Sequence, residues 1–162
     1  MRKYTDNTEK TDRRGFMPNV FPTAKGKHYQ FPTHVNDLII DRAQAKNSEV
    51  FIVVLKPGQA PPLHRHPDVE QVFYLISGRG TLVLSSARKK FKVRAGDAVL
   101  IPPATWHTIQ ADAGVTVRYF AVDCFGGKRN PQEPTWDRHV RVVCREQGWD
   151  YKKIVKSRVR CN

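Results

Sequence analysis

Short apolar runs separated by turn-forming residues dominate the middle of the chain. Runs of this kind, bounded by Gly, Pro, Asn or Asp, are typical of β-strands. No helical period intervenes between residues 49 and 122. The pattern predicts strands over residues 38–40, 49–56, 72–76, 81–84, 90–93, 98–101, 108–110 and 115–122.

The spacing of these strands carries information about the fold. The run over residues 49–56, EVFIVVLK, is apolar on both faces, as in a strand that is covered on both sides. The tripeptide Gly78-Arg79-Gly80 predicts a tight hairpin. Many short strands joined by turns favour a sandwich or barrel over a parallel sheet. We therefore expect an all-β fold over residues 37–127.

The two ends of the chain read differently from this middle part. Residues 1–36 are polar, rich in turn formers and without a sustained period, which predicts an irregular N-terminal arm whose few apolar groups lie against the strands or a partner. Residues 128–162 predict a C-terminal extension, with a further strand over residues 139–144 and a short helix over residues 146–156. We take residues 1–162 as a single domain.

Isolated aromatic residues and histidines outside the middle part have simpler interpretations. We expect Trp136, Trp149 and Tyr151 to cover an open end of the barrel or to contact another subunit. The remaining histidines are expected at the surface, the last of them in an exposed strand: His28, His34 and His139.

Composition indicates a globular protein rather than a membrane-spanning or secreted one. With 40% hydrophobic residues, the 162-residue chain can build a core, and no apolar run is long enough to cross a membrane. The basic N-terminus lacks the apolar segment of a secretory signal. Cys124, Cys144 and Cys161 are odd in number and have no metal-site spacing, which suits a reducing compartment. We predict a cytoplasmic protein.

The net charge of +13 comes mainly from the two ends of the chain. Lys and Arg outnumber Asp and Glu by seven to three in residues 1–36 and by ten to four in residues 128–162, against eleven to eight in residues 37–127. We find no recognised nucleic-acid motif, so the basic ends predict a solvated periphery that attracts polyanions without specificity. No specific nucleic-acid partner is expected.

Two histidines one residue apart, His64 and His66, form the most informative motif of the chain. They follow the Pro57-Gly58 turn and precede the Glu70-Gln71 pair, which leads into an apolar run. In an extended segment, residues i and i+2 point to the same side, so both imidazoles can reach one point. A third histidine, His107, ends a second turn-rich stretch, GDAVLIPPATWH. Imidazole and oxygen donors suit a divalent transition metal: iron, manganese, nickel or zinc.

The two stretches together resemble the paired motifs of the cupin superfamily. Gly58, His64, His66 and Gly78 match the first family motif. Gly96, Pro102 and His107 match the second family motif. This sequence has Ala104 where the family has Gly, and Ala111 where the family has Asn. The resemblance covers roughly residues 37–127 and implies a double-stranded β-helix (jelly-roll) barrel, a metal site and a homodimer.

The fourth ligand is ambiguous in the sequence. Counting forward from His66 places the acidic ligand of the family at Glu70, whereas counting back from Gly78 places it at Gln71. Neighbouring strand residues point to opposite faces, so the two alternatives exclude each other. We favour Gln71, because strand register is firmer than a Pro-containing loop. Inward Gln71 then implies inward Phe73 and Leu75, and inward His107 implies inward Ile109.

Three classes of function remain open from the sequence. The first is a metalloenzyme of dioxygenase, isomerase or lyase type that acts on a small oxygen-rich or anionic molecule. The second is a binding module for a small ligand or metal without turnover. The third is a metal-free barrel that serves assembly. The fold alone does not choose among them.

Overall fold

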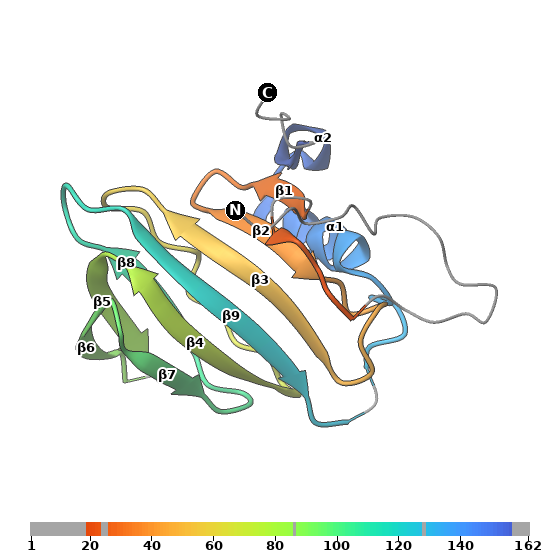
Figure 1. Ribbon diagram of the computed structural model, residues 1–162, viewed down its shortest axis with the longest axis horizontal. Coiled ribbons are helices and arrows are strands. Elements are labelled where there is room, and N and C mark those ends of the chain that lie inside the picture. The colour runs from red at the N-terminus through yellow and green to blue at the C-terminus, as the bar shows by residue number, and fades with distance from the viewer. Residues whose placement is uncertain (1–18, 24–25, 86, 128, 157–162) are drawn as a thin grey trace, which may run out of the picture.

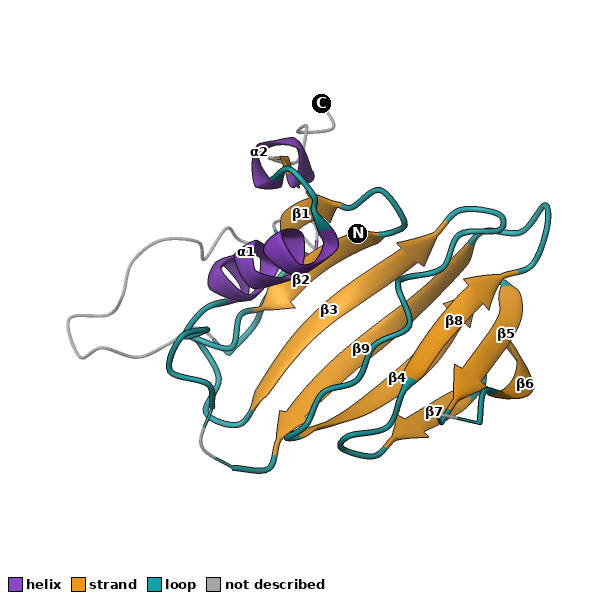
Figure 2. Ribbon diagram, turned by 180° about the vertical axis from the view of Figure 1, so that it is seen from behind, coloured by secondary structure: helices purple, strands orange, loops and turns teal. Residues whose placement is uncertain are grey.

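Two antiparallel sheets make up most of the molecule (Figure 1 and Figure 2). The computed structural model describes residues 19–23, 26–85, 87–127 and 129–156. Within these residues, one sheet has seven strands in the order β10-β1-β2-β3-β9-β4-β7 and the other has three in the order β6-β5-β8. The elements are β1 (Lys27–Gln30), β2 (Val35–Ile40), β3 (Ser48–Leu55), β4 (Val69–Ser77), β5 (Arg79–Leu84), β6 (Lys89–Arg94), β7 (Ala98–Ile101), β8 (His107–Ala111), β9 (Val117–Phe125), α1 (Trp136–Gln147), α2 (Tyr151–Ile154) and β10 (Val155–Lys156).

The alternation along β4 shows how the sequence selects the inner face of the larger sheet. Residues 69, 71, 73 and 75 are buried, whereas residues 70, 72, 74 and 76 are exposed. Side chains of a strand alternate between its two faces, so this parity directs Phe73 and Leu75 into the core, as expected. Ile109 of β8 is buried too, which confirms the predicted inner face of the second sheet.

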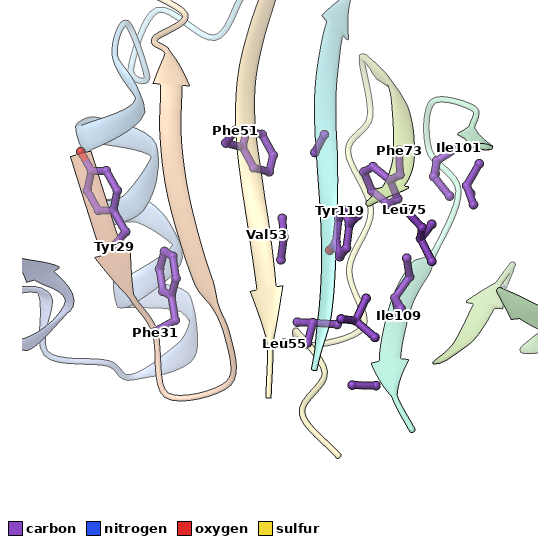
Figure 3. Packing of buried hydrophobic residues seen from close by; sticks show 14 of the residues in the cluster. Tyr29, Phe31, Phe51, Val53, Leu55, Phe73, Leu75, Ile101, Ile109 and Tyr119 are labelled. Carbon is purple, nitrogen blue, oxygen red and sulfur yellow. The ribbon is translucent and has the colours of Figure 1, made fainter. Parts of the chain in front are cut away.

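One apolar core joins the two sheets. Figure 3 shows Phe51 and Val53 of β3, Tyr119 of β9 and Phe73 of β4 following one another across the larger sheet. Residues of β5, β6 and β8 belong to the same buried cluster. On β3 both faces are buried over residues 50–53, which confirms the prediction of a strand covered on both sides.

The predicted hairpin at Gly78 is wrong. β4 pairs with β7 and β9, whereas β5 pairs with β6 and β8, so the chain crosses from one sheet to the other at this glycine. Gly78 has φ +85°, and a Cβ at this position would lie 2.3 Å from the carbonyl oxygen of Thr116. Gly is required here for a corner between sheets, a feature that shares its sequence signal with a hairpin turn.

The N-terminal part is more regular than the sequence suggests. β1 and the first residues of β2 lie within residues 1–36, where an irregular arm is expected; residues 1–18 lie outside the described part. Tyr29 and Phe31 are buried, which confirms that apolar groups of this part lie against the rest of the molecule. β1 has a single buried residue, Tyr29, and β2 buries the polar Asn36, so neither strand shows the apolar alternation that would have revealed it.

The C-terminal prediction is wrong in its elements. A helix, α1, occupies residues 136–147 in place of the strand expected over residues 139–144, and the expected helix over residues 146–156 is reduced to α2. Thr135 caps the first turn by accepting a hydrogen bond from the backbone NH of Arg138, and Gly148 ends the helix with φ +69°. The run HVRVVC alternates in polarity as a strand does, so the sequence does not separate a strand period from a helix period here. In the structure, Trp136, Val140 and Cys144 share the buried face of the helix.

These elements confirm an all-β, double-stranded β-helix (jelly-roll) architecture with few helices. Figure 2 shows α1 on the side of the seven-stranded sheet that is also crossed by the loop between β3 and β4. Among the described residues, no helix has the length and apolar character needed to cross a membrane.

Candidate metal centre

Three histidines from two distant stretches meet on the inner side of the jelly roll. His64 and His66 lie in the loop between β3 and β4, and His107 begins β8. One nitrogen of each ring lies within 4.8 Å of the corresponding nitrogens of the other two. The ring centroids are 4.4 Å apart for His64 and His107, 5.0 Å for His64 and His66, and 5.7 Å for His66 and His107.

Backbone hydrogen bonds hold the loop against β8. The NH of His64 donates to the carbonyl of His107 (3.3 Å), and the NH of His107 donates to the carbonyl of His64 (2.8 Å). Further along, the hydroxyl of Thr108 donates to the carbonyl of Pro61 (2.7 Å). An isolated antiparallel bridge thus joins the loop to β8 and brings the two histidine stretches together.

Hydrogen bonds from Nδ1 to backbone carbonyl oxygens set the tautomers of two of the rings, His64 and His107. Nδ1 of His64 lies 2.7 Å from the carbonyl oxygen of Pro62, and Nδ1 of His107 lies 2.9 Å from that of Thr105. A carbonyl oxygen only accepts, so each Nδ1 carries the hydrogen and each Nε2 keeps its lone pair. The Nε2 atom of His107 is buried and has no hydrogen-bond partner among the described residues. Such a polar atom fits a metal ligand, whose other ring nitrogen is held by an outer hydrogen bond.

Burial keeps these imidazoles neutral. It lowers the pKa of His107 from 6.5 to about 4, and it also lowers the pKa of His64. The pKa of His66 lies well below 6.5, because of burial first and the neighbouring imidazoles second. Metal ligation requires the unprotonated ring, so all three histidines are in the form that binds metal at neutral pH.

The structure distinguishes Gln71 from Glu70 by burial. Gln71 is 3% exposed and lines the same cavity as the three histidines, whereas Glu70 is exposed on the opposite face of β4. The amide Nε2 of Gln71 donates to Oδ1 of Asp123 at 2.7 Å. Its Oε1 is buried and has no partner within the described part of the chain.

Buried charges lie beside this amide, and sequence reasoning missed them. Arg42 donates through Nε and Nη2 to the two carboxylate oxygens of Glu49, at 2.6 and 2.7 Å. Burial, followed by the nearby Glu49, raises the pKa of Asp123 well above its usual value. The available signal was parity, since Glu49 and Asp123 occupy inward positions of otherwise apolar strands.

The histidines open into a cavity of about 620 Å³. Phe73 and Ile109 form part of its wall, as expected from strand parity, and Tyr119 lines it too. Trp136 and Trp149 of the extension line it as well. Tyr151 does not line it and instead donates its hydroxyl to Asp137.

His139 is wrongly predicted as an exposed strand residue. It lies in α1, lines the cavity and places its ring centroid 6.4 Å from that of His66. Its Nδ1 contacts Oε2 of Glu133 at 2.6 Å, and this hydrogen bond is the main cause of the lowered pKa of the Glu133 carboxyl. Arg42 also reaches Glu133, at 3.3 Å. His139 and Glu133 thus form a second polar wall of the cavity. The sequence does not reveal this wall, because it does not predict helix α1.

His34 is also misplaced by the sequence. It was expected at the surface, yet it is only 8% exposed and its ring stacks on Phe31 with centroids 4.5 Å apart. Burial lowers its pKa to about 3. His28 is more open and contacts Asp37 at 2.7 Å.

Comparison with known sequences gives local matches over the site. A family model described as Cupin domain matches residues 51–123, which include all three histidines. An uncharacterised protein of Methanocaldococcus jannaschii is 34% identical over 65 residues, 40% of this chain and 50% of that protein. Auxin-binding protein 5 of Zea mays is 44% identical over 46 residues, 28% of this chain and 30% of that protein. The matches thus span half or less of the length of these relatives.

Solved structures match a larger share of the chain. A predicted oxalate decarboxylase from Thermotoga maritima has a TM-score of 0.60 at 16% identity, covering 65% of this chain and 98% of that one. The polyketide cyclase RemF from Streptomyces resistomycificus has a TM-score of 0.59 at 20% identity, covering 72% and 89%. KdgF from Halomonas sp. has a TM-score of 0.57 at 17% identity, covering 70% and 96%. These similarities concern the fold alone. The family match and the paired histidine motifs thus identify a cupin domain over residues 51–123, and these structures share its fold.

Proposed function

We propose that the protein is a metal-dependent cupin that binds a small anionic or oxygen-rich organic molecule on a divalent transition metal and converts it. The metal ligands in this proposal are His64, His66, His107 and Gln71. The observation that carries it is the convergence of three neutral imidazoles, one with a buried and unpartnered Nε2, on one wall of a cavity. Iron, manganese, nickel and zinc all suit this set of donors.

The charge of the ligands determines the class of molecule that the site prefers. Three neutral imidazoles and an amide leave the full charge of a divalent ion in place, so an anionic oxygen group is favoured at an open position. A bound ion would act as a Lewis acid toward such a group. An auxin-binding protein among the relatives and a predicted oxalate decarboxylase among the structural neighbours agree with a small organic ligand.

The chain's own side chains supply the rest of the site. The apolar wall formed by Phe73, Tyr119 and Ile109 excludes water and strengthens polar interactions with the ligand. Across from the triad, His139 has its Nδ1 engaged by Glu133, which leaves Nε2 to accept a hydrogen bond or a proton from a ligand in the cavity. Conversion by a dioxygenase, isomerase or lyase reaction is compatible with these groups.

A binding module without turnover is the second candidate. Glu49 and Asp123 are already engaged by Arg42 and Gln71, and His139 with Glu133 is an acid–base pair that faces the cavity. Incubation of metal-loaded protein with a panel of hydroxy acids, diketones and sugar derivatives separates the candidates. Product formation by the wild type supports the enzyme, and saturable binding without product supports the module.

The metal ligands are tested by elemental analysis of purified variants. We expect stoichiometric metal in the wild type and loss of that metal in His66→Ala and His107→Ala, with the far-UV circular dichroism unchanged because the apolar core does not include the ion. His28→Ala, on the outer part of the molecule, is the matched control and should keep the metal. Gln71→Ala should weaken metal retention more than Glu70→Ala does. Stoichiometric metal in His107→Ala contradicts the proposed site.

A further inference from the structure

A row of polar residues crosses the inner face of the larger sheet beside the histidine triad. Glu49 of β3 and Gln71 of β4 are the two cross-strand neighbours of Asp123 in β9. The three side chains are 0%, 3% and 4% exposed for Glu49, Gln71 and Asp123, respectively. Arg42 ends the row through its two hydrogen bonds to Glu49. The row therefore runs from a guanidinium through two carboxylates to an amide.

The hydrogen bonds and charges of this row restrict which side chain fits at position 71. Asp123 lies opposite Glu49 on the neighbouring strand, and Arg42 gives its two short hydrogen bonds to Glu49 rather than to Asp123. The amide of Gln71 adds no charge and donates to Asp123 at 2.7 Å. A glutamate at this position would add a third carboxylate and would remove that donor.

We infer that Asp123 determines the oxygen donor of the proposed metal site. By accepting a hydrogen bond from Nε2 of Gln71, Asp123 requires an amide at this position, holds it in one orientation and leaves Oε1 free. Asp123 is thus a positioning residue that keeps the donor set uncharged and, with it, the preference for an anionic ligand. This inference rests in part on the proposed function, since it assigns Oε1 of Gln71 to the metal.

An exchange of the two side chains tests the inference in the metal-free protein. Gln71→Glu should lower the urea midpoint, because Asp123 loses its amide donor and gains a buried acidic neighbour. Asp123→Asn should have a small effect, because its amide oxygen still accepts from Gln71. The double variant Gln71→Glu/Asp123→Asn restores one amide, one acidic group and the hydrogen bond between them, so its midpoint should recover toward the wild-type value. The double-mutant cycle measures this coupling, and Glu70→Gln on the outer face is the control.

Cobalt binding gives a second measurement that does not depend on turnover. Asp123→Leu removes the acceptor, so we expect the Co²⁺ dissociation constant to rise by about 10–100-fold, the usual effect of losing an outer hydrogen-bond partner of a ligand. Asp123→Asn should keep the wild-type constant. The double variant should bind Co²⁺ more tightly than the wild type and bind added acetate more weakly, since a carboxylate donor offsets part of the charge of the ion. The visible absorption of Co²⁺ reports both events.

The two measurements separate this inference from the proposed function. Additive effects of Gln71→Glu and Asp123→Asn on the urea midpoint would overturn the role of Asp123, whatever the metal does. An unchanged Co²⁺ constant in a folded Asp123→Leu variant would overturn it too. If the wild type takes up no Co²⁺, the proposed metal site fails, while the cycle in urea still decides whether Asp123 selects an amide.

Discussion

His34 shows how burial of a single side chain couples stability to pH. Its ring stacks on Phe31, and its Nδ1 lies 2.9 Å from the hydroxyl of Thr33. Burial lowers its pKa to about 3, whereas the unfolded chain has the usual value of 6.5. Between these values the unfolded state binds a proton that the folded state does not, so His34 lowers stability as the pH falls from 6.5 toward 3.

Replacement of His34 by Phe should reduce this acid sensitivity. Phe keeps the stacking on Phe31 but does not titrate. Across the window below pH 6.5, His34 contributes a slope of up to about 1.4 kcal/mol per pH unit, and the variant should lose it. Urea unfolding of both metal-free proteins at pH 7 and pH 5 measures the difference, because the other buried imidazoles are common to both. Equal slopes would contradict a buried, neutral His34.

At the residue scale, the sequence identifies the residues that we propose as metal ligands but not their surroundings. The histidine motifs identify His64, His66 and His107 because their spacing is local and set by strand geometry. Parity makes Gln71 and Glu70 exclusive alternatives, and the register counted back from Gly78 selects Gln71, which the structure places inward. Arg42 and Glu133 could not be found in this way, since they contact each other across most of the chain and no local pattern records such a contact.

Among the turns, the departure of Ala104 from the family motif has a physical cost. Ala104 adopts φ +59°, a left-handed conformation that Gly adopts freely and other residues do not. Its NH donates to the carbonyl of His66 at 2.6 Å, so the strained turn ties the second histidine stretch to the first. The backbone strain at Ala104 thus lies where the loop between β7 and β8 contacts the histidine triad.

Ala104→Gly should therefore stabilise the protein by about 1 kcal/mol, because glycine relieves the steric cost of the left-handed turn. Gly96→Ala is the reciprocal control, since Gly96 has φ +94° and a Cβ there would meet no atom within 4 Å. That variant introduces strain without a clash and should destabilise by a similar amount. Thermal unfolding of the metal-free proteins measures both shifts. Destabilisation by Ala104→Gly would show that the turn is not strained.

Secondary-structure elements are predicted best where apolar and polar residues alternate clearly. They are predicted worst where both a strand period and a helix period fit the sequence. Every predicted strand between residues 37 and 127 corresponds to a strand of the structure, with ends that differ by a few residues. The sequence predicts a hairpin at Gly78 because glycine at a sheet corner gives the same signal. Helix α1 was missed because three valines and a histidine in HVRVVC alternate as they would in a strand.

The C-terminal extension is part of the same core as the sheets. Trp136, Val140 and Ile154 belong to the buried cluster that contains residues of both sheets, and β10 pairs with β1. Phe51 of β3 lies 4.7 Å from Trp136 between ring centroids. A single domain over the whole chain stays a prediction, as do the homodimer and the cytoplasmic location. Because the extension packs into the core, the prediction of a single domain can be tested directly.

Val140 is fully buried, so Val140→Ala should destabilise the whole molecule by about 2 kcal/mol. If residues 27–156 unfold as one unit, the tryptophan fluorescence and the far-UV circular dichroism must change at the same urea concentration, and the substitution must shift both by the same amount. Two of the three tryptophans lie in the extension, so fluorescence reports chiefly on that part, whereas circular dichroism includes the sheets. Val20→Ala, at a position that is 70% exposed, removes the same atoms and should shift neither. A fluorescence transition that moves alone would mean that α1 unfolds independently, and the wall carrying His139 and Glu133 would then open without loss of the histidine triad.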